Sequence, residues 1–253
     1  MKAVKLLDGK IALITGASKG IGRAIALGMA DVGADIIATA RTELELRELC
    51  DEIRMKGRRA EYIVADLRST EEAKEMARKA LGIFGRVDIL VNNAGVSYPQ
   101  PALETTEDRW DETFQINLKS LFFLTQIIAR AMVEQGGGKI INISSQAGLV
   151  GLEDHAAYCA SKGALILLTK VLAIEWGKYK INVNAVAPTI IMTPMAERAW
   201  ADAKKREEAL KKIPLGRFGQ PEDVVGAVVF LASPYADLIT GAVIPIDGGY
   251  TAQ

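Results

Sequence analysis

The sequence predicts one α/β domain, a doubly wound parallel sheet with helices on both faces, and two observations predict it. Short β-branched runs alternate with longer stretches of helical periodicity along all 253 residues. The strand-like runs are continuously apolar, which is typical of strands buried on both faces of a parallel sheet. Because no repeat, low-complexity stretch or linker divides the chain, we expect residues 1–253 to form a single domain.

The expected elements follow one another as strand and helix, which favours a sheet of about seven strands. The strands are expected at Ile11–Thr15, Asp35–Ala38, Glu61–Ala65, Val87–Asn92, Lys139–Ser144, Ile181–Val186 and Ala242–Ile246. Helices are expected from Arg23 and at Thr42–Lys56, Ser69–Phe84, Thr106–Glu134 and His155–Lys178.

One connection, at about residues 189–215, is longer than the others and becomes charged and helical from Glu197 to Lys212. Long connections in compact domains are often lids or binding loops. In this architecture ligands bind beyond the carboxyl ends of the strands, where this insert would lie. We therefore predict a substrate loop, with a surface helical hairpin as the alternative.

Composition excludes several classes of function. Formal net charge is +0, from 31 basic and 31 acidic residues, so nucleic acid is not expected as a partner. Cys50 and Cys159 match no metal or redox spacing, and His155 is the one histidine, so we expect free thiols, a reducing cytoplasmic compartment and no metal site. The N-terminus lacks the core of a signal peptide and no apolar run approaches about 20 residues, so no membrane is expected.

A glycine-rich turn joins the first strand to the helix from Arg23. It reads Thr-Gly-Ala-Ser-Lys-Gly-Ile-Gly over residues 15–22. Glycines permit a tight turn and close approach to a pyrophosphate, and the helix N-terminus offers free N–H groups. The turn therefore predicts a dinucleotide site, with a plain strand–helix turn as the alternative. The expected contacts are Gly16, Ser18, Lys19, Gly20, Ile21 and Gly22.

The end of the second strand predicts which dinucleotide is bound. An acidic residue there usually meets an unmodified ribose, whereas an arginine can hold a 2′-phosphate. Here Arg41 stands at the strand tip, and Lys19 offers a second cation. This favours NADP(H). The alternatives are that Glu43 reaches the ribose of NAD(H) while Arg41 stacks on the adenine, or that Arg41 is merely solvated.

Further candidate cofactor contacts follow the third and fourth strands, at the same edge of the sheet. Asp66, with Leu67 beside it, is placed to accept a hydrogen bond from the adenine amino group. Asn93, Ala94 and Gly95 are expected to line the cofactor channel. The preceding Asn92 equally suits a role in holding strands together.

Tyr158 and Lys162 are four residues apart, so on a helix they share one face. A free tyrosine has a pKa near 10, and a nearby ammonium lowers it. Lowering this pKa from 10 to about 7 would require roughly 4 kcal/mol of stabilisation of the phenolate. Lys162, helped by an oxidised nicotinamide, is the evident source of that stabilisation. Tyr158 is then a proton donor or acceptor. The alternative is an ordinary helical tyrosine with a lysine neighbour.

These residues together resemble the short-chain dehydrogenase/reductase family. The resemblance spans essentially the whole chain and is carried by the glycine turn, Asn92-Asn-Ala-Gly95, Asn117, Ser145, Tyr158-x-x-x-Lys162 and Asp247-Gly-Gly. It implies a Rossmann-type fold and a catalytic set of Asn117, Ser145, Tyr158 and Lys162, with Ser144 as the fallback for Ser145. It also implies that Asn117 holds a water in a proton relay to Lys162. The cofactor contacts would extend to Tyr158, Lys162, Pro188, Ile191 and Thr193.

Within this family the chain is similar to sugar, polyol and gluconate dehydrogenases and to 3-oxoacyl-carrier-protein reductases. The segments Ser144–Gly148, Glu175–Gly177 and Val186–Thr189 favour the first group. We therefore expect an NAD(P)-dependent oxidoreductase acting on a CH–OH group of a sugar, polyol or hydroxy acid. The carrier-protein reductase is the alternative, and a non-catalytic dinucleotide-binding sensor or scaffold is the alternative of another class. Expected substrate contacts are Ser145, Gln146, His155 and Tyr158.

The two long helices, Thr106–Glu134 and His155–Lys178, carry apolar residues around much of their circumference. Such helices are buried in the core or against a partner. Relatives in the family usually form tetramers, so a homotetramer, or a homodimer, is expected. The alternative is burial under the chain's own loops.

Overall fold

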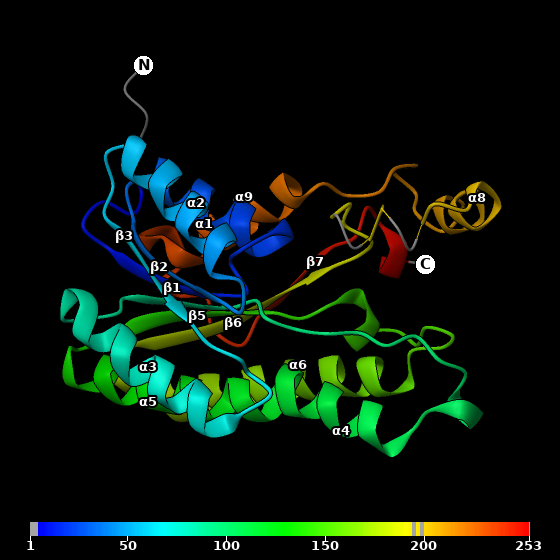
Figure 1. Cartoon of the computed structure of the whole chain (residues 1–253), viewed down its shortest axis with the longest axis horizontal. Helices are drawn as coiled ribbons and strands as arrows, with labels where there is room; N and C mark the ends of the chain where they lie inside the picture. The colour runs from blue at the N-terminus through cyan, green and yellow to red at the C-terminus, as the bar shows by residue number, and fades with distance from the viewer. Residues whose placement is uncertain (1–4, 194–195, 198–199, 253) are drawn as a thin grey trace.

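The computed structural model describes residues 5–193, 196–197 and 200–252, and confirms the doubly wound parallel sheet (Figure 1). Seven parallel strands lie in the order β3-β2-β1-β4-β5-β6-β7. Their bounds are β1 Ile11–Thr15, β2 Asp35–Ala40, β3 Ala60–Val64, β4 Ile89–Asn92, β5 Gly138–Ile143, β6 Ile181–Pro188 and β7 Val243–Ile246. The strand order reverses between β1 and β4, which is where open sheets of this kind bind ligands.

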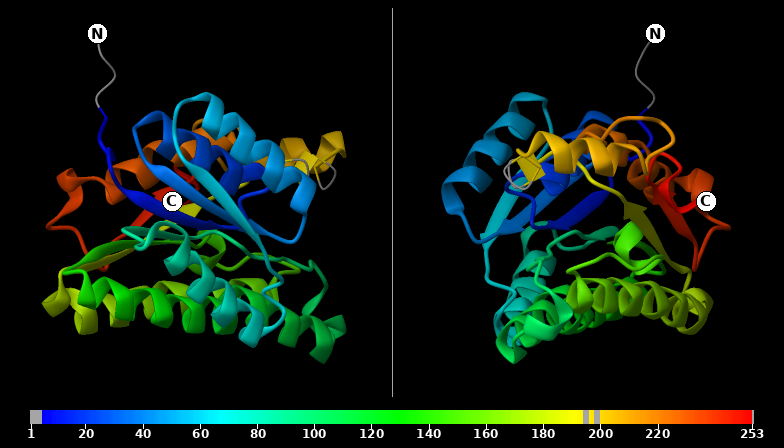
Figure 2. Two further views of the ribbon diagram at one scale, coloured as in Figure 1. Left: turned by 60° about the vertical axis from the view of Figure 1, so that its left-hand side comes forward. Right: turned by 90° about the vertical axis from the view of Figure 1, so that its right-hand side faces the viewer.

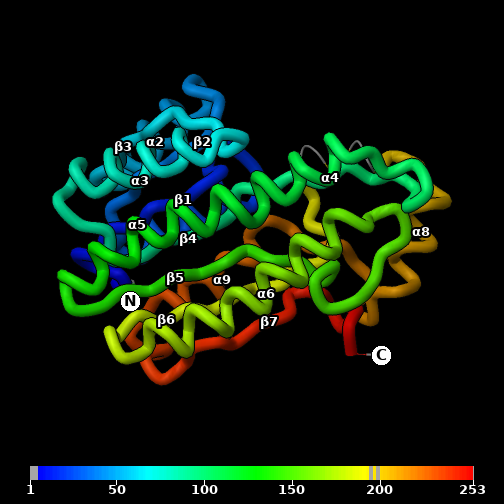
Figure 3. Tube along the Cα trace, turned by 90° about the horizontal axis from the view of Figure 1, so that it is seen from below, coloured from blue at the N-terminus to red at the C-terminus, as the bar shows by residue number. Residues whose placement is uncertain are grey.

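Helices cover both faces of the sheet, giving the three layers seen in Figure 2. One face carries α1 (Gly20–Asp31), α2 (Glu43–Met55) and α9 (Pro221–Ala232). The other carries α3 (Thr70–Phe84), α4 (Glu107–Phe114), α5 (Leu121–Glu134) and α6 (Ala156–Trp176). Seen from that side in Figure 3, α3, α5 and α6 follow one another across the sheet. Short 3-10 turns lie at Ala102–Glu104, Gln146–Gly148, Gly177–Tyr179, Pro234–Ala236 and Tyr250–Ala252.

The core has one part on each side of the sheet, as the continuous apolar strands predict. In β1, Ala12 and Ile14 pack with residues of α1, α2 and α9, whereas Ile11 and Leu13 pack with residues of α3 and α5. All five residues of the strand are buried. Because side chains alternate between faces, this one strand ties the two halves of the core together.

The long helix expected at Thr106–Glu134 is interrupted. A π-helical turn, η2 (Gln115–Ser120), separates α4 from α5, and Asn117 lies within it. Asparagine is a poor residue for a helix interior, and its side chain here bonds to the backbone of another segment. Such π turns are frequent at functional sites, because they redirect one side chain out of the helical pattern.

The insert at 189–215 differs in detail from the expected helix over 197–212. Its helix α8 spans Ala203–Leu210, because Asp202 caps it by accepting a hydrogen bond from Lys205 N at 2.8 Å. Positions 194–195 and 198–199 lie outside the described residues. The insert has a small core of its own, formed by Ala209, Ile213 and Phe218 with Tyr250 against it. The C-terminal turn therefore supports the insert.

Two helical stretches among the described residues, Glu107–Glu134 and Ala156–Tyr179, have the length and composition of membrane spans. Both lie against the sheet and contribute Leu124, Ile128, Leu165 and Leu172 to the buried core. Core helices of water-soluble proteins pass the same test, so these helices are weak evidence for a membrane.

Candidate active site

A groove of about 290 Å³ runs along the carboxyl edge of the sheet, where β1, β2 and β4 end. It also touches the start of α1 and the beginning of the insert. Most of the predicted cofactor residues line it: Gly16, Ser18, Lys19, Gly20, Ile21, Gly22, Arg41, Asp66, Leu67, Asn93, Ala94, Gly95 and Thr193. The structure therefore brings together residues from five separate segments of the chain.

The glycine turn is shaped by its neighbours as well as by any ligand. Gly16 has φ 64°, and a Cβ there would lie 2.9 Å from Asn93 Nδ2. A Cβ at Gly22 would overlap the Gly16 carbonyl and the Asn93 amide. Asn93 Nδ2 donates to the carbonyls of Thr15 (2.8 Å) and Gly16 (3.0 Å). The turn and the Asn93-Ala94 segment thus hold each other, and a side chain at either glycine would close the groove.

The tip of β2 brings one arginine and two glutamates close to the groove. Arg41 lines the groove, and no salt bridge of its guanidinium is found in the part of the chain that the structure describes. Lys19 Nζ lies 4.0 Å from Glu45 Oε1. Glu43, the alternative ribose ligand, accepts a hydrogen bond from the Tyr62 hydroxyl at 3.0 Å and is absent from the groove lining. At this end of the groove Arg41 therefore lies near the Asp66 carboxylate, while Glu43 is turned to Tyr62.

The Asp66 carboxylate already accepts hydrogen bonds within the protein, which the sequence did not predict. Its carboxylate accepts from Arg68 Nε at 2.8 Å and from the Arg68 backbone at 2.9 Å. These hydrogen bonds, together with the charges of Arg68 and Arg41, hold the pKa of Asp66 below its usual value. An ionised carboxylate has about four acceptor sites. An adenine amino group can therefore still reach Asp66, but in competition with Arg68.

Tyr158 and Lys162 share a face of α6, as their spacing predicts. The Lys162 ammonium lies 5.8 Å from the centre of the Tyr158 ring and donates to the Ile143 carbonyl at 2.8 Å. Burial lowers the pKa of Lys162 to about 8. Its side chain comes from the helix, and its partner from the end of β5, so the ammonium is held between the sheet and α6.

The expectation that Lys162 lowers the pKa of Tyr158 is not met in the chain alone. Burial raises the pKa of Tyr158, while hydrogen bonding with Ser145 acts in the opposite direction. The ammonium bonds to the Ile143 carbonyl and not to the phenol, so desolvation dominates. Tyr158 is therefore a neutral phenol at neutral pH, ready to donate a proton.

Ser145 and Ser144 have different surroundings, which distinguishes the two candidates. Ser144 Oγ donates to the Lys162 carbonyl at 3.0 Å, so its hydroxyl is committed to the α6 backbone. Ser145 caps the 3-10 turn that follows β5, accepting from Ala147 N at 3.1 Å, and it hydrogen-bonds with Tyr158. Its hydroxyl lies 3.5 Å from the Pro188 carbonyl at the end of β6. The structure thus joins Ser145, and not Ser144, to Tyr158.

Asn117 is fully buried and acts as a clamp. Its side chain accepts from Val96 N at 2.8 Å and donates to the Val96 carbonyl at 2.9 Å. It also donates to Ser161 Oγ at 3.1 Å. The π turn therefore connects the loop after β4 to the helix that carries Tyr158 and Lys162. The water relay implied for Asn117 stays a prediction.

The expected substrate contacts Gln146 and His155 lie in the turn that follows Ser145 and just before α6, the helix that carries Tyr158. Gln146 is 3% exposed, and its Oε1 has no hydrogen-bond partner among the described residues. The His155 ring lies 6.1 Å from that of Tyr158, and its Nδ1 contacts the Glu153 carbonyl at 2.6 Å. Thr189 Oγ1, at the start of the insert, is likewise buried and unpaired in this part of the structure. Buried unpaired acceptors are costly, so each of these two oxygens calls for a hydrogen-bond donor.

The remaining predicted cofactor contacts lie where β6 leads into the insert. Pro188 ends β6, and Ile191 forms a bridge to Gly219, closed by Met192 N donating to the Gly219 carbonyl at 2.8 Å. Thr193 Cγ2 would lie 3.0 Å from a Cβ at Gly20. The insert is thus anchored directly beside the glycine turn.

Sequence reasoning missed several residues that build the site. Thr15 Oγ1 accepts from both Asn93 N and Ala94 N at 3.0 Å, and so fixes the loop after β4. Asn142 accepts from Asn92 Nδ2 at 2.8 Å. The Asn92 side chain therefore joins β4 to β5, which is one of the two roles that the sequence suggested for it. The groove is completed by Thr39, Ala40, Thr42, Ala65, Val96 and Ile116. For all of these except Val96 and Ile116, a position at or just after a strand end was the available signal.

Within the described residues, no group of three or more His, Cys, Asp or Glu side chains is arranged to hold a metal ion.

Comparison with known proteins shows the family. A family model described as enoyl-(acyl carrier protein) reductase matches residues 16–251. The chain is 45% identical to L-xylulose reductase of Bos taurus, over 97% of this chain and 98% of that protein. It is 41% identical to an NAD-dependent glycerol dehydrogenase of Listeria innocua, over 98% of this chain and 96% of that protein.

A solved structure of gluconate 5-dehydrogenase from Burkholderia cenocepacia, in complex with NADP and tartrate, superimposes with a TM-score of 0.94. It is 35% identical to this chain and covers 99% of it, while the chain covers 98% of that structure. Shared motifs, whole-chain similarity and fold agree, and the chain belongs to the short-chain dehydrogenase/reductase family of oxidoreductases, which act on alcohol and keto groups.

Proposed function

We propose that the chain transfers a hydride between NADP(H) and a ketone or secondary alcohol of a sugar, polyol or hydroxy acid. One observation carries the proposal, namely that Tyr158, Ser145 and Lys162 meet at the carboxyl edge of the sheet beside the dinucleotide groove. A non-catalytic sensor would not need a buried ammonium beside a phenol. Bound nicotinamide supplies the hydride donor or acceptor.

The groove fits a dinucleotide. A Cβ at Gly16 or Gly22 would collide with the turn or with Asn93, so glycine keeps the turn tight, and the N-terminus of α1 lies beside it, which suits a pyrophosphate. Arg41 and Lys19 would meet the 2′-phosphate of the adenosine ribose, because charge-assisted contacts to phosphate are strong. The turning of Glu43 towards Tyr62 supports NADP(H) over NAD(H).

The protein's own groups would manage the proton. In carbonyl reduction, the neutral Tyr158 phenol donates its proton to the substrate oxygen, and the Ser145 hydroxyl hydrogen-bonds that oxygen as charge develops. The Lys162 ammonium then stabilises the phenolate that remains. Asn117 keeps α6 and the loop after β4 in register by its bonds to Ser161 and Val96. Oxidation uses the same groups in reverse.

The substrate class rests on the polar groups beyond Tyr158 and on the names of the relatives. The unpaired Gln146 Oε1 would accept a hydrogen bond from a substrate hydroxyl, and the His155 ring lies 6.1 Å from the Tyr158 ring. Sites built to hydrogen-bond a hydroxyl discriminate strongly against analogues that lack it. L-xylulose reductase, glycerol dehydrogenase and gluconate dehydrogenase are relatives named for such hydroxyl-rich substrates.

The proposal is tested by following NADPH and NADH oxidation with a panel of L-xylulose, 5-ketogluconate, dihydroxyacetone and acetoacetyl thioesters. We expect NADPH to be preferred and one of the hydroxylated ketones to be reduced fastest. The carrier-protein reductase gains support from the basic side chains of α8, and fastest turnover of the thioester would replace the sugar or polyol assignment with it. Turnover of no ketone at all would contradict the proposal.

We also propose a cytoplasmic homotetramer, or homodimer. Leu167, Val171 and Ile174 form an exposed apolar stripe on α6, with Ile174 82% exposed. Side chains at this spacing lie on one helix face, which favours burial against a second copy of the chain. Light scattering of the purified protein would test this, and a monodisperse monomer would contradict it. The free thiols of Cys50 and Cys159 suit a reducing compartment.

A further inference from the structure

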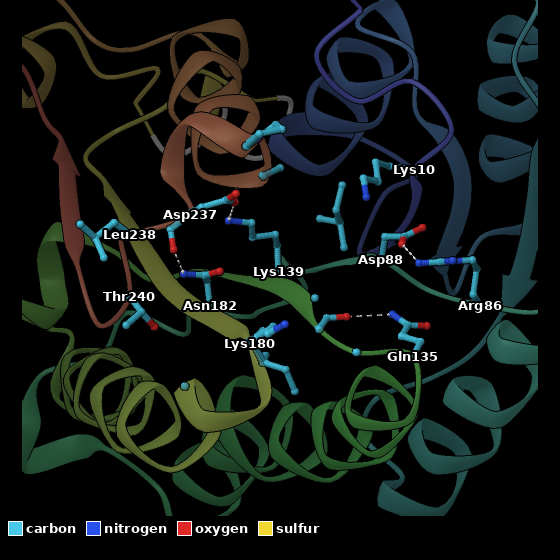
Figure 4. Close-up of a pocket in the computed structure, with 18 residues that line it drawn as sticks. Lys10, Arg86, Asp88, Gln135, Lys139, Lys180, Asn182, Asp237, Leu238 and Thr240 are labelled. Atoms are coloured by element: carbon cyan, nitrogen blue, oxygen red, sulfur yellow. Dashed lines mark hydrogen bonds and ion pairs between the residues drawn. The ribbon is translucent and has the colours of Figure 1, made fainter.

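A second cavity, of about 650 Å³, opens at the opposite edge of the sheet from the dinucleotide groove. Figure 4 shows it between the residue that precedes β1, the amino ends of β4, β5 and β6, and the turn after α9. Its volume lies in the range of small-molecule sites. None of the groups assigned to hydride transfer reaches it.

Cationic side chains from four separate segments line this cavity: Lys10, Arg86, Lys139 and Lys180. Two carboxylates are present, and each is already engaged. Asp237 accepts from Lys139 Nζ at 2.7 Å. Asp88 pairs with Arg86 and accepts from Ile11 N at 2.9 Å. The cavity therefore has an excess of positive charge.

Lys10 and Lys180 carry that excess. Neither ammonium has a salt bridge or hydrogen bond in residues 5–193, 196–197 and 200–252, and Figure 4 places the two on different walls of the cavity. Lysines scattered on a surface are normally solvated and carry no information. Here the two unpaired ammonium groups share one cavity with Lys139, which is paired with Asp237 and whose side chain is only 14% exposed.

The backbone fixes the position of Lys180. It has φ 60°, in the left-handed region that favours glycine, and its carbonyl accepts from Gly138 N at 3.2 Å. A Cβ at Gly137 would lie 2.7 Å from that carbonyl. A lysine in this conformation costs about 1 kcal/mol relative to glycine. Strain of this kind at an exposed position is a reason to look for a function of the side chain.

The walls are also preformed. Gln135 Nε2 donates to the carbonyls of Val87 (2.7 Å) and Gly137 (3.2 Å). Asn182 Nδ2 donates to the carbonyls of Asp237 and Ile239, each at 3.0 Å. The amides therefore hold the loops together, so the cations surround a cavity that exists before any ligand enters.

We propose that this cavity binds a small polyanion, held by the ammonium groups of Lys10 and Lys180 with Lys139 and Arg86 around them. The chemistry that recognises it is compact negative charge of two or more, as carried by a phosphate group or by several carboxylates on one small molecule. The site is separate from hydride transfer and does not depend on the function proposed above.

The test is isothermal titration of the NADP-saturated protein with inorganic phosphate and, separately, with citrate, so that the dinucleotide groove is filled. The double variant Lys10→Gln, Lys180→Gly removes both unpaired charges, and glycine relieves the backbone at residue 180. Lys79→Gln is a control for the general effect of losing a lysine charge, because Lys79 is exposed on α3, outside both cavities.

We expect saturable binding of one anion per chain to the wild type and to Lys79→Gln, and binding weaker by about tenfold or more in the double variant, equivalent to about 1.4 kcal/mol. Tighter binding of phosphate than of citrate would identify a phosphorylated ligand, and the reverse a polycarboxylate. Absence of saturable binding by both probes, or unchanged binding in the double variant, would overturn the proposal.

Discussion

Replacing Lys162 with methionine should make the cofactor-free protein more stable while abolishing turnover. Lys162 is 4% exposed, and burial lowers its pKa from 10.5 to about 8. A difference of about 2.5 in pKa corresponds to about 3 kcal/mol of unfavourable burial of the charged form. Methionine has a similar length and no charge, so Lys162→Met removes this cost.

The gain is reduced by one lost hydrogen bond. The Ile143 carbonyl loses its bond to the ammonium, which costs about 1 kcal/mol. The net expectation is an increase of about 2 kcal/mol in the free energy of unfolding at neutral pH. For a chain of this size that raises the Tm by roughly 4–8 °C.

The pH dependence gives the prediction its sign. Between pH 8 and 10.5 the unfolded chain holds the Lys162 proton that the folded chain has released, so wild-type stability rises with pH across that window. The methionine variant has no such group. Its advantage should therefore shrink by about 2 kcal/mol between pH 7 and about pH 9.5.

Urea unfolding of both cofactor-free proteins at these two pH values measures the effect, with Lys79→Met as a control at an exposed lysine. A methionine variant that is less stable than the wild type at neutral pH, or an advantage that does not change with pH, would refute the reasoning.

Four further results are expected. Tyr158→Phe should reduce turnover by about 10²–10⁴ while NADPH binding by fluorescence titration stays intact; near-full activity would remove Tyr158 from its role. Arg41→Asp should shift the ratio of NADPH to NADH affinity towards NADH by about tenfold or more, whereas Glu43→Gln should leave it unchanged. NADPH-dependent reduction should decline as pH rises through about 8, where Lys162 loses the charge that stabilises the phenolate, and a flat profile up to about pH 10 would contradict this. Gly22→Ala should abolish cofactor binding, because the Cβ meets the Gly16 carbonyl; unchanged affinity would show that the turn can relax.

Much of the fold followed from the sequence, because its periodicities are local. The alternation of apolar runs with helical segments predicted the seven strands, and most boundaries differ by one or two residues. β6 is longer than expected because its end continues to pair with β7 up to Pro188. Pairing with a strand some 60 residues away is not written in the local sequence.

The π turn at Asn117 shows what local pattern cannot predict. The sequence around Asn117 has the periodicity of an ordinary helix, and the turn is stabilised by two hydrogen bonds to Val96, more than 20 residues earlier. The unsuitability of asparagine for a helix interior was the one available signal.

The sequence predicted most of the residues that line the groove, but not the electrostatics around Tyr158. The four-residue spacing correctly placed Lys162 beside Tyr158, but not the bond from its ammonium to the Ile143 carbonyl. Burial therefore governs the pKa of Tyr158, where the sequence suggested charge. In the same way Glu43 was an open alternative until its hydrogen bond to Tyr62, on the neighbouring strand β3, was seen.

The central claim is that Tyr158 and the dinucleotide groove serve hydride transfer to a carbonyl. Its most direct test is to reduce a ketose such as L-xylulose with NADPH deuterated at the nicotinamide C4 and to analyse the product by mass spectrometry. We expect the wild type to form polyol with one deuterium on the new carbinol carbon, and Tyr158→Phe to form none. Two results would contradict this. One is polyol that carries no deuterium, whichever of the two hydrogens at C4 of NADPH is replaced. The other is equal polyol formation by Tyr158→Phe.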